Sequence, residues 1–287
     1  MNERAEQRLR EVTRRIQDIS TLPHIAMRIL EVECDPKSST ADLSEVLEQD
    51  PALSSRVLRY VNSAAYGVRA KITNLRQAVT HLGLKRIRNL AVTASVSELF
   101  QTDQQIGSYR RSTLWRHQVS VAMCARMIGK RLGLRTPEDI FLAGLLHDIG
   151  IILEDQYAHS EFEQVMLHLP EYQSLPDAER HYLGFDHTRL GEVIGGRWGF
   201  PKLVRLAIRY HHASEQAPPG DRTEVQCVEV ANLFCTLKGI TSVGRKLVRY
   251  TPETLKTLGL TRQDVALLGD ELDTELERGA ELVRMVG

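Results

Sequence analysis

The sequence predicts an all-α protein, and two observations support this fold class. Apolar residues recur along nearly the whole chain at the spacing of an amphipathic helix. No segment of the sequence shows the alternation of polar and apolar residues that indicates a half-buried strand. We therefore expect a multi-helix bundle, with its helices divided between two halves of the chain.

Length and composition narrow the class of protein. A chain of 287 residues can form two modest domains or one large one, and its 42% hydrophobic and 26% charged residues are typical of a globular protein. The 37 basic residues equal the 37 acidic ones, so no overall field attracts nucleic acid or an anionic membrane. The N-terminus lacks the apolar core of a signal peptide, and no stretch of the sequence approaches the roughly 20 apolar residues of a membrane span. The four cysteines show no CxxC spacing, so we expect free thiols in a cytoplasmic protein without membrane contact.

Capping residues mark the helix starts of the first half. Ser39 and Asp42 fit a capping box, Asp50 precedes Pro51 as an N-cap, and Asn74 fits a further N-cap. We expect a first helix that stops before Pro23, a second through Ile25 to Leu30 that ends near Asp35-Pro36, and a short third through Leu43 to Leu47. A fourth starts at Pro51, a fifth runs through Leu75 to Leu82 and ends at Gly83, and a sixth covers LKRIRNLAVTASVSELF.

A polar segment, QTDQQIGSYRR at residues 101–111, interrupts the helical pattern and contains Gly107. We place the boundary here, between a smaller N-terminal helical subdomain (1–107) and a larger helical subdomain (108–287). Helices of the second half are expected at about 113–132, from 136 to the His147-Asp148 pair, and at 160–169, 178–182, 188–197, 201–212 and 225–237, followed by an acidic amphipathic C-terminal helix or pair.

The stretch FLAGLLHDIG (141–150) places His147 and Asp148 at the end of a small, apolar helix. An imidazole and a carboxylate are costly to bury there unless something satisfies them. A metal ion, a hydrogen-bond network or a helix cap would each do so.

Histidines elsewhere in the second half favour the metal ion. The helices that carry His117 and His147 are joined by a short turn, so an antiparallel pair would bring them within one or two turns of each other. Imidazole and carboxylate ligands suit iron, manganese, nickel or zinc, and a bridging Asp can hold two ions. The candidate ligands in chain order are His117, His147, Asp148, His187, His211 and His212. The remaining histidines, His24, His81, His159, His168 and His181, are expected to be surface or hydrogen-bonded core residues.

This order of residues, with Ile149-Gly150 after the His-Asp pair, resembles the metal site of the HD superfamily of phosphohydrolases, especially its HD-GYP branch. In the first half, DPALSSRVLRYVNSAAYG and ITNLRQAVTHLG resemble the HDOD domain, an HD relative of bacterial signalling proteins. The resemblance covers roughly residues 20–240. It implies an HD-like helical fold for the second half and adds Asn232, in VEVANLFCTL, as the last member of the metal set.

Departures from the catalytic pattern concern three positions. HD enzymes usually have an Asp where this chain has Asn232, and an amide oxygen is a weaker, neutral metal donor. The Lys that commonly follows HDIG in HD-GYP enzymes is Ile151 here, and the GYP signature is replaced by HHASEQAPPGD. Retention of the histidines implies a divalent metal, with room for two ions, whereas these changes imply weak or no hydrolysis.

The sequence leaves three candidate functions to be compared. The resemblance and the departures favour a signalling regulator that binds metal, and a protein partner or a nucleotide second messenger, without efficient turnover. The retained histidines support the alternative of a metal-dependent phosphohydrolase that acts on a cyclic dinucleotide or another phosphoester. Residues 41–60 superficially resemble a helix-turn-helix, but Glu45, Glu48 and Asp50 oppose DNA binding there, so we do not expect it. The basic patch of Lys85, Arg86 and Arg88 is expected to be a solvated helix face and is a minor candidate for partner binding.

Overall fold

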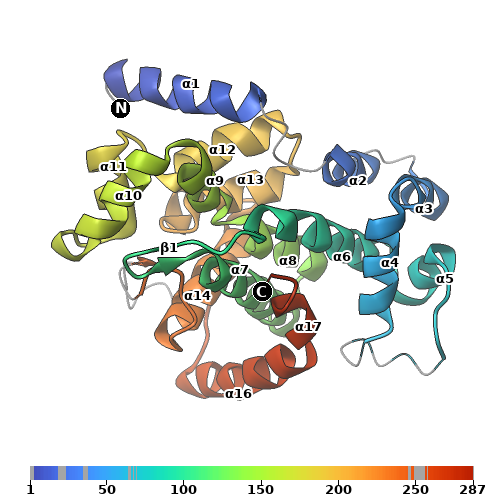
Figure 1. The fold of residues 1–287 in the computed structure, drawn as a ribbon. Helices are drawn as coiled ribbons and strands as arrows, with labels where there is room; N and C mark the ends of the chain where they lie inside the picture. The colour runs from blue at the N-terminus through green and yellow to red at the C-terminus, as the bar shows by residue number, and fades with distance from the viewer. Residues whose placement is uncertain are drawn as a thin grey trace.

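The computed structural model describes residues 3–18, 24–34, 38–63, 66, 68, 70–244, 247–248, 256 and 258–286. Most of its described residues lie in helices and very few in strands, which confirms the all-α fold class (Figure 1). The helix ends predicted at Pro23 and at Asp35-Pro36 lie outside the described residues. No helix of the described part is long and apolar enough to cross a membrane.

The first half contains a small group of packed helices, α2 to α6, and one helix that lies apart from them. Figure 1 shows α1 over α9 and α12 of the second half, with which it is in contact. The predicted boundary between residues 107 and 108 stays a prediction, but α1 packs against the second half. The bounds are α1 (Glu3–Asp18), α2 (His24–Cys34), α3 (Thr40–Glu48), α4 (Pro51–Val61), α5 (Leu75–Leu82) and α6 (Leu84–Val96).

The second half surrounds a long central helix, α7, that contacts α8, α14, α16 and α17. The segment predicted to break the helical pattern is a short antiparallel hairpin, β1 (Gln105–Ile106) and β2 (Tyr109–Arg110), after the 3-10 turn η2 (Ser97–Phe100). The other elements are α7 (Arg111–Arg131), α8 (Pro137–Leu146), α9 (Ile149–Tyr157), α10 (His159–His168), η3 (Leu169–Glu171), α11 (Leu175–Tyr182), α12 (His187–Arg197), α13 (Lys202–Tyr210), η4 (Ser214–Gln216), α14 (Arg222–Leu237), α16 (Arg262–Arg278) and α17 (Ala280–Val283).

Helix starts agree with the capping residues that the sequence contains. Ser39 and Asp42 form the capping box of α3, the Asp50 side chain accepts from the backbone N–H of Leu53, and Asn74 caps α5. Residues 41–60, which superficially resemble a helix-turn-helix, form α3 and α4, and Arg56 of α4 is paired with Glu98 at 2.5 Å.

The structure adds a helix that the sequence did not predict. The helix expected to finish at His147-Asp148 is followed at once by α9, with the pair forming the junction. The backbone departs from helical angles at Asp148 (φ −101°, ψ 18°), so the direction of the chain changes there. The two site residues therefore project from a bend between two buried helices rather than from a free helix end.

The basic patch of α6 is solvated at Lys85 and Arg86 but not at Arg88. Arg88 is buried and pairs with Asp139 of α8 at 3.1 Å. Lys85 lies 2.6 Å from the other Asp139 oxygen, and Arg86 lies 3.3 Å from Glu138. The prediction of a solvated position was therefore wrong for Arg88, which joins α6 to the acidic first turn of α8. Partner binding by the patch stays a prediction.

Two glycines let helices approach closely around the His147-Asp148 junction. A Cβ added at Gly144 would lie 2.9 Å from the Cα of Ala122 on α7, and one at Gly150 would lie 2.0 Å from the carbonyl oxygen of His187 on α12. No side chain larger than hydrogen fits at such separations. The small residues of FLAGLLHDIG thus bring α7 and α12, and the histidines on them, against the junction.

Candidate metal centre

The predicted ligands come from separate helices and converge on one buried point. His117 lies on α7, His147 and Asp148 at the α8–α9 junction, His187 at the start of α12, His211 and His212 at the end of α13, and Asn232 on α14. All of these are fully buried except His212, which is partly buried. The geometric expectation that the scattered imidazoles meet around the acid is confirmed.

The carboxylate of Asp148 lies at the centre of the group. Its Oδ2 lies 3.1 Å from Nε2 of His147 and 3.7 Å from Nε2 of His117. Its Oδ1 lies 3.2 Å from Nε2 of His211 and 3.5 Å from Nε2 of His187. One oxygen therefore faces each of two sets of imidazoles. The His117 and His147 rings, expected to be near each other, have centroids 5.5 Å apart.

The tautomers of three histidines are fixed by their surroundings. In each of them the Nδ1 atom contacts backbone carbonyl oxygens, which can only accept, so Nδ1 must carry the hydrogen. The unprotonated Nε2 atom of each neutral ring then faces Asp148. The acceptors are Ile240 O for His117 (2.8 Å), Gly144 O for His147 (2.7 Å), and Ala207 O and Ile208 O for His211 (3.0 Å each).

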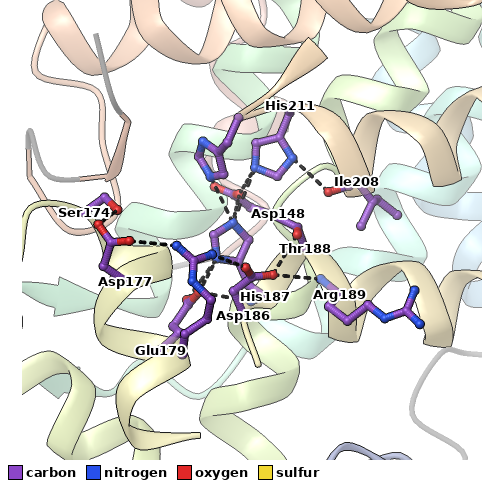
Figure 2. Close-up of polar contacts among 12 residues, drawn as sticks. Asp148, Ser174, Asp177, Glu179, Asp186, His187, Thr188, Arg189, Ile208 and His211 are labelled. Atoms are coloured by element: carbon purple, nitrogen blue, oxygen red, sulfur yellow. Dashed lines mark hydrogen bonds and ion pairs between the residues drawn. The ribbon is translucent and has the colours of Figure 1, made fainter. Parts of the chain in front are cut away.

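His187 is held by a carboxylate instead. Figure 2 shows its ring between Glu179 of α11 and His211. The Nδ1 atom lies 2.7 Å and 2.9 Å from the two Glu179 oxygens, and the backbone N–H of His187 donates to Glu179 at 3.0 Å. Burial lowers the pKa of His187, but Glu179 outweighs it and the pKa is raised to about 9. Carboxylate support of this kind orients a metal-binding imidazole and increases its basicity.

Behind Glu179 lies a second buried acid, Glu154 of α9. Burial and the neighbouring Glu179 carboxylate raise the pKa of Glu154 well above its ordinary value. The sequence analysis named neither glutamate. An acid within the apolar run IILED was a signal for Glu154, whereas Glu179 lies on a helix with ordinary surface composition and gave none.

His212 completes a second group of donors. Its Nε2 atom lies 3.1 Å from Nε2 of His187, and the Nε2 atoms of His187 and His211 are 3.4 Å apart. Imidazole lone pairs this close repel each other unless a proton or a cation lies between them. The potential ligand atoms of Asp148, His187, His211 and His212 lie within 4.8 Å of one another, and so do those of His117, His147 and Asp148.

Electrostatics keep most of this group in a metal-binding form. Burial lowers the pKa of His117 to about 4 and that of His211 to about 4, and it also lowers the pKa of His212. Burial opposes ionisation of Asp148, but its contacts with His147 and His211 hold the pKa well below the usual range. The centre therefore presents an ionised carboxylate and, at His117, His211 and His212, neutral imidazoles, which are the forms that bind divalent metal.

Asn232 lies beside the centre. It contacts His117, where it favours the charged imidazole, and its Oδ1 atom accepts from Thr236 at 3.5 Å. Among the described residues, none accepts a hydrogen bond from the buried Nδ2 atom of Asn232. An amide therefore lies where HD enzymes usually have a carboxylate.

The residues present fit a divalent metal. Within the described part of the chain, both Asp148 oxygens and the Nε2 atoms of His117 and His147 are buried without a hydrogen-bond partner. The Asp148 side chain makes no capping bond to α9, which excludes the helix-cap explanation. Buried polar atoms without partners are uncommon in native proteins and favour an ion or a water molecule between them. The potential ligand groups of the described residues include none of the five histidines assigned above to the surface or core.

Comparison with known proteins identifies the family. A sequence model of the HDOD domain matches residues 19–214. The chain belongs to the HDOD domain family. A crystal structure of an HDOD domain protein with unknown function from Geobacter sulfurreducens superposes with a TM-score of 0.78 at 30% identity and covers 98% of both chains.

Two curated relatives of this HDOD chain are longer proteins. An uncharacterized protein of Treponema pallidum (strain Nichols) is 27% identical over 76% of this chain and 42% of its own length. The cyclic di-GMP phosphodiesterase CdgJ of Vibrio cholerae is 24% identical over 51% of this chain and 31% of its own length. The HDOD chain therefore spans less than half the length of these relatives.

Proposed function

We propose that this HDOD chain is a regulatory module of bacterial signalling whose histidine-aspartate centre binds one or two divalent ions without efficient turnover. The observation that carries the proposal is the orientation of the donors. His117, His147 and His211 each direct an unprotonated Nε2 toward a shared carboxylate, while the other ring nitrogen is held by the backbone. Fixed tautomers and a buried anion favour a cation at that point.

Two positions support binding over catalysis. A divalent ion at such a centre would supply a Lewis acid and lower the pKa of bound water. Asn232 cannot supply the negative charge that an Asp would add, and Ile151 stands where HD-GYP enzymes commonly have a Lys. The chain's own residues can hold and orient an ion, but fewer of them can assist proton transfer.

A metal-dependent phosphohydrolase is the second candidate, and one observation favours it. His212 is partly buried and lines a cavity of about 710 Å³, so a ligand in that cavity would reach the centre. The name of CdgJ as a cyclic di-GMP phosphodiesterase refers to that protein, and it makes cyclic dinucleotides reasonable trial substrates here. A protein partner for the signalling role stays a prediction.

Metal content separates these ideas from a purely structural centre. We expect protein purified without chelator to contain about one or two equivalents of iron, manganese, nickel or zinc, measured by plasma mass spectrometry. Asp148→Asn and His211→Gln preserve volume and should lose most of that metal, whereas His81→Ala, on an exposed position of α5, should retain it. Retention of full metal content by Asp148→Asn and His211→Gln would exclude the centre.

Turnover separates the two candidates. The metal-loaded protein is assayed with a cyclic dinucleotide and with a generic phosphodiester. Metal without hydrolysis supports the regulator, whereas hydrolysis that disappears in Asp148→Asn and persists in His81→Ala would replace it with the enzyme.

A further inference from the structure

The cavity beside His212 has an uneven distribution of charge. It lies between α11, α12 and α13, with α1 at its rim. A volume of about 710 Å³ is within the range of small-molecule sites. Arg180, Arg189 and Arg209 line it, together with two acids, Glu6 and Asp186.

One of these arginines is already neutralised. Arg180 lies 2.7 Å from Asp177 and also pairs with Asp186. Asp186 is in turn occupied as the N-cap of α12, where it accepts from the backbone N–H of Arg189 at 3.1 Å and from the Thr188 hydroxyl at 2.7 Å (Figure 2). This side of the cavity is a closed network that holds the first turn of α12 in place.

The other two arginines share a single acid. Arg189 lies 2.5 Å and Arg209 lies 3.5 Å from the same Glu192 oxygen. Arg209 also donates to the Thr188 hydroxyl at 2.9 Å, which fixes its direction. Two guanidinium groups against one carboxylate leave a local excess of positive charge, and the pairs are exposed enough for a ligand to compete with them.

The position of this excess charge relates it to the metal centre. His212 lines the same cavity and belongs to the donor group around Asp148. The apolar residues Pro176 and Phe185 line another part of the wall. An anion held by the arginines would therefore share the cavity with His212, and an organic substituent would contact the apolar wall.

We propose that Arg189, Arg209 and His212 form a binding site for the phosphoryl group of a small phosphate ester, with its organic part in the remaining cavity. Guanidinium groups match phosphate oxygens in geometry and bind them through charge-assisted hydrogen bonds. The inference rests on the proposed function in one respect, because the phosphate ester would be the ligand of the same metal centre.

Glu6 gives the proposal an internal check. It lines the cavity from α1, on a segment outside the matched HDOD region, and is half-exposed with an intrahelical partner, Arg10, at 3.6 Å. A carboxylate on the wall opposes anion binding by the same physics that makes the arginines favour it. Its removal should therefore strengthen binding, and such a gain cannot result from misfolding.

The test measures binding of phenylphosphonate, whose P–C bond prevents hydrolysis, by calorimetry on the 287-residue chain with and without chelator. We expect Arg189→Gln and Arg209→Gln each to weaken binding roughly three- to tenfold, and Glu6→Gln to strengthen it roughly two- to threefold. The matched controls are Arg205→Gln on α13 and Glu11→Gln on α1, both exposed and outside the cavity wall, and they should bind as wild type.

Two results would overturn the site: no binding by wild-type protein at millimolar phenylphosphonate, or equal losses in Arg189→Gln and Arg205→Gln. Failure of the metal centre is seen separately. If purified protein holds no metal but the arginine and Glu6 variants shift affinity as expected in chelator, the phosphoryl site stands and the metal proposal falls. If metal is bound and the variants bind like wild type, the reverse holds.

Discussion

Substitution of Gly150 by Ala tests whether helix contact creates the centre. The added Cβ would lie 2.0 Å from the His187 carbonyl oxygen, 2.7 Å from its carbonyl carbon and 2.9 Å from its Cα. Ordinary contact begins at about 3.4 Å, so α9 and the start of α12 must separate by more than an ångström. All three atoms are backbone, and no rotamer change can relieve the clash.

Gly150→Ala should lower the free energy of unfolding strongly, and Gly196→Ala is a control in which the same quantity should rise. Overpacking typically destabilises by 1–3 kcal/mol, and a clash with fixed backbone places Gly150→Ala at about 3 kcal/mol or more. Gly196 lies near the end of α12, where an added Cβ would meet only the tip of the Arg205 side chain at 4.0 Å. Gly196→Ala should therefore stabilise the protein by roughly 0.5–1 kcal/mol through helix propensity.

Urea denaturation of both variants, followed by circular dichroism, gives the two free energies of unfolding. Metal content should also fall in Gly150→Ala, because His187 moves away from Asp148 with the start of α12. If Gly150→Ala unfolds at the same urea concentration as wild type and keeps its metal, then close approach of α9 and α12 does not position the ligands.

Three further predictions concern the same centre. The folded-state pKa values of His117 and His211, about 4, lie below the 6.5 of an unfolded histidine, so the unfolded chain binds more protons between these values. The free energy of unfolding of chelator-treated protein should therefore fall by about 2 kcal/mol per histidine between pH 7 and pH 5. His187 partly offsets this loss, because its raised pKa acts in the opposite sense. Urea denaturation at the two pH values measures the change. Glu179→Gln should weaken metal binding by about 10- to 100-fold in a competition titration. The metal affinity of the wild-type protein should rise with pH up to about 9, because His187 must release its proton to bind metal. Asn232→Asp should tighten metal binding and raise any measured hydrolysis, and unchanged binding would show that residue 232 lies outside the ligand set.

Local chemistry explains which parts of the fold the sequence could predict. The starts of α3, α4 and α5 followed from Ser39, Asp50 and Asn74, because a cap acts within one turn of chain. The bend at His147-Asp148 did not follow, since α9 continues the apolar pattern of α8 and only the packed helices around the junction define the bend.

The same distinction applies to the site. The order of the histidines, read with the family resemblance, predicted the group that meets at Asp148. Glu179 could not be predicted from the chain alone, because its contact with His187 depends on how α11 returns to the start of α12. Arg88 of α6 was misassigned to a solvated face for a related reason, since its acidic partner, Asp139, lies about fifty residues later.

The first turn of α12 connects the metal centre to the cavity. His187 faces Asp148, while the next two residues, Thr188 and Arg189, line the cavity and are held by Asp186 as the N-cap. A ligand that draws Arg189 away from its present position must act on the turn that holds His187 against the centre. Such a ligand changes the affinity of the centre for metal by some factor. By thermodynamic reciprocity, a metal ion that orders His187 must then change the affinity of the cavity for the ligand by the same factor. Such coupling needs no hydrolysis, and a module that has an amide where HD enzymes have an acid could use it to report ligand or metal occupancy to a partner.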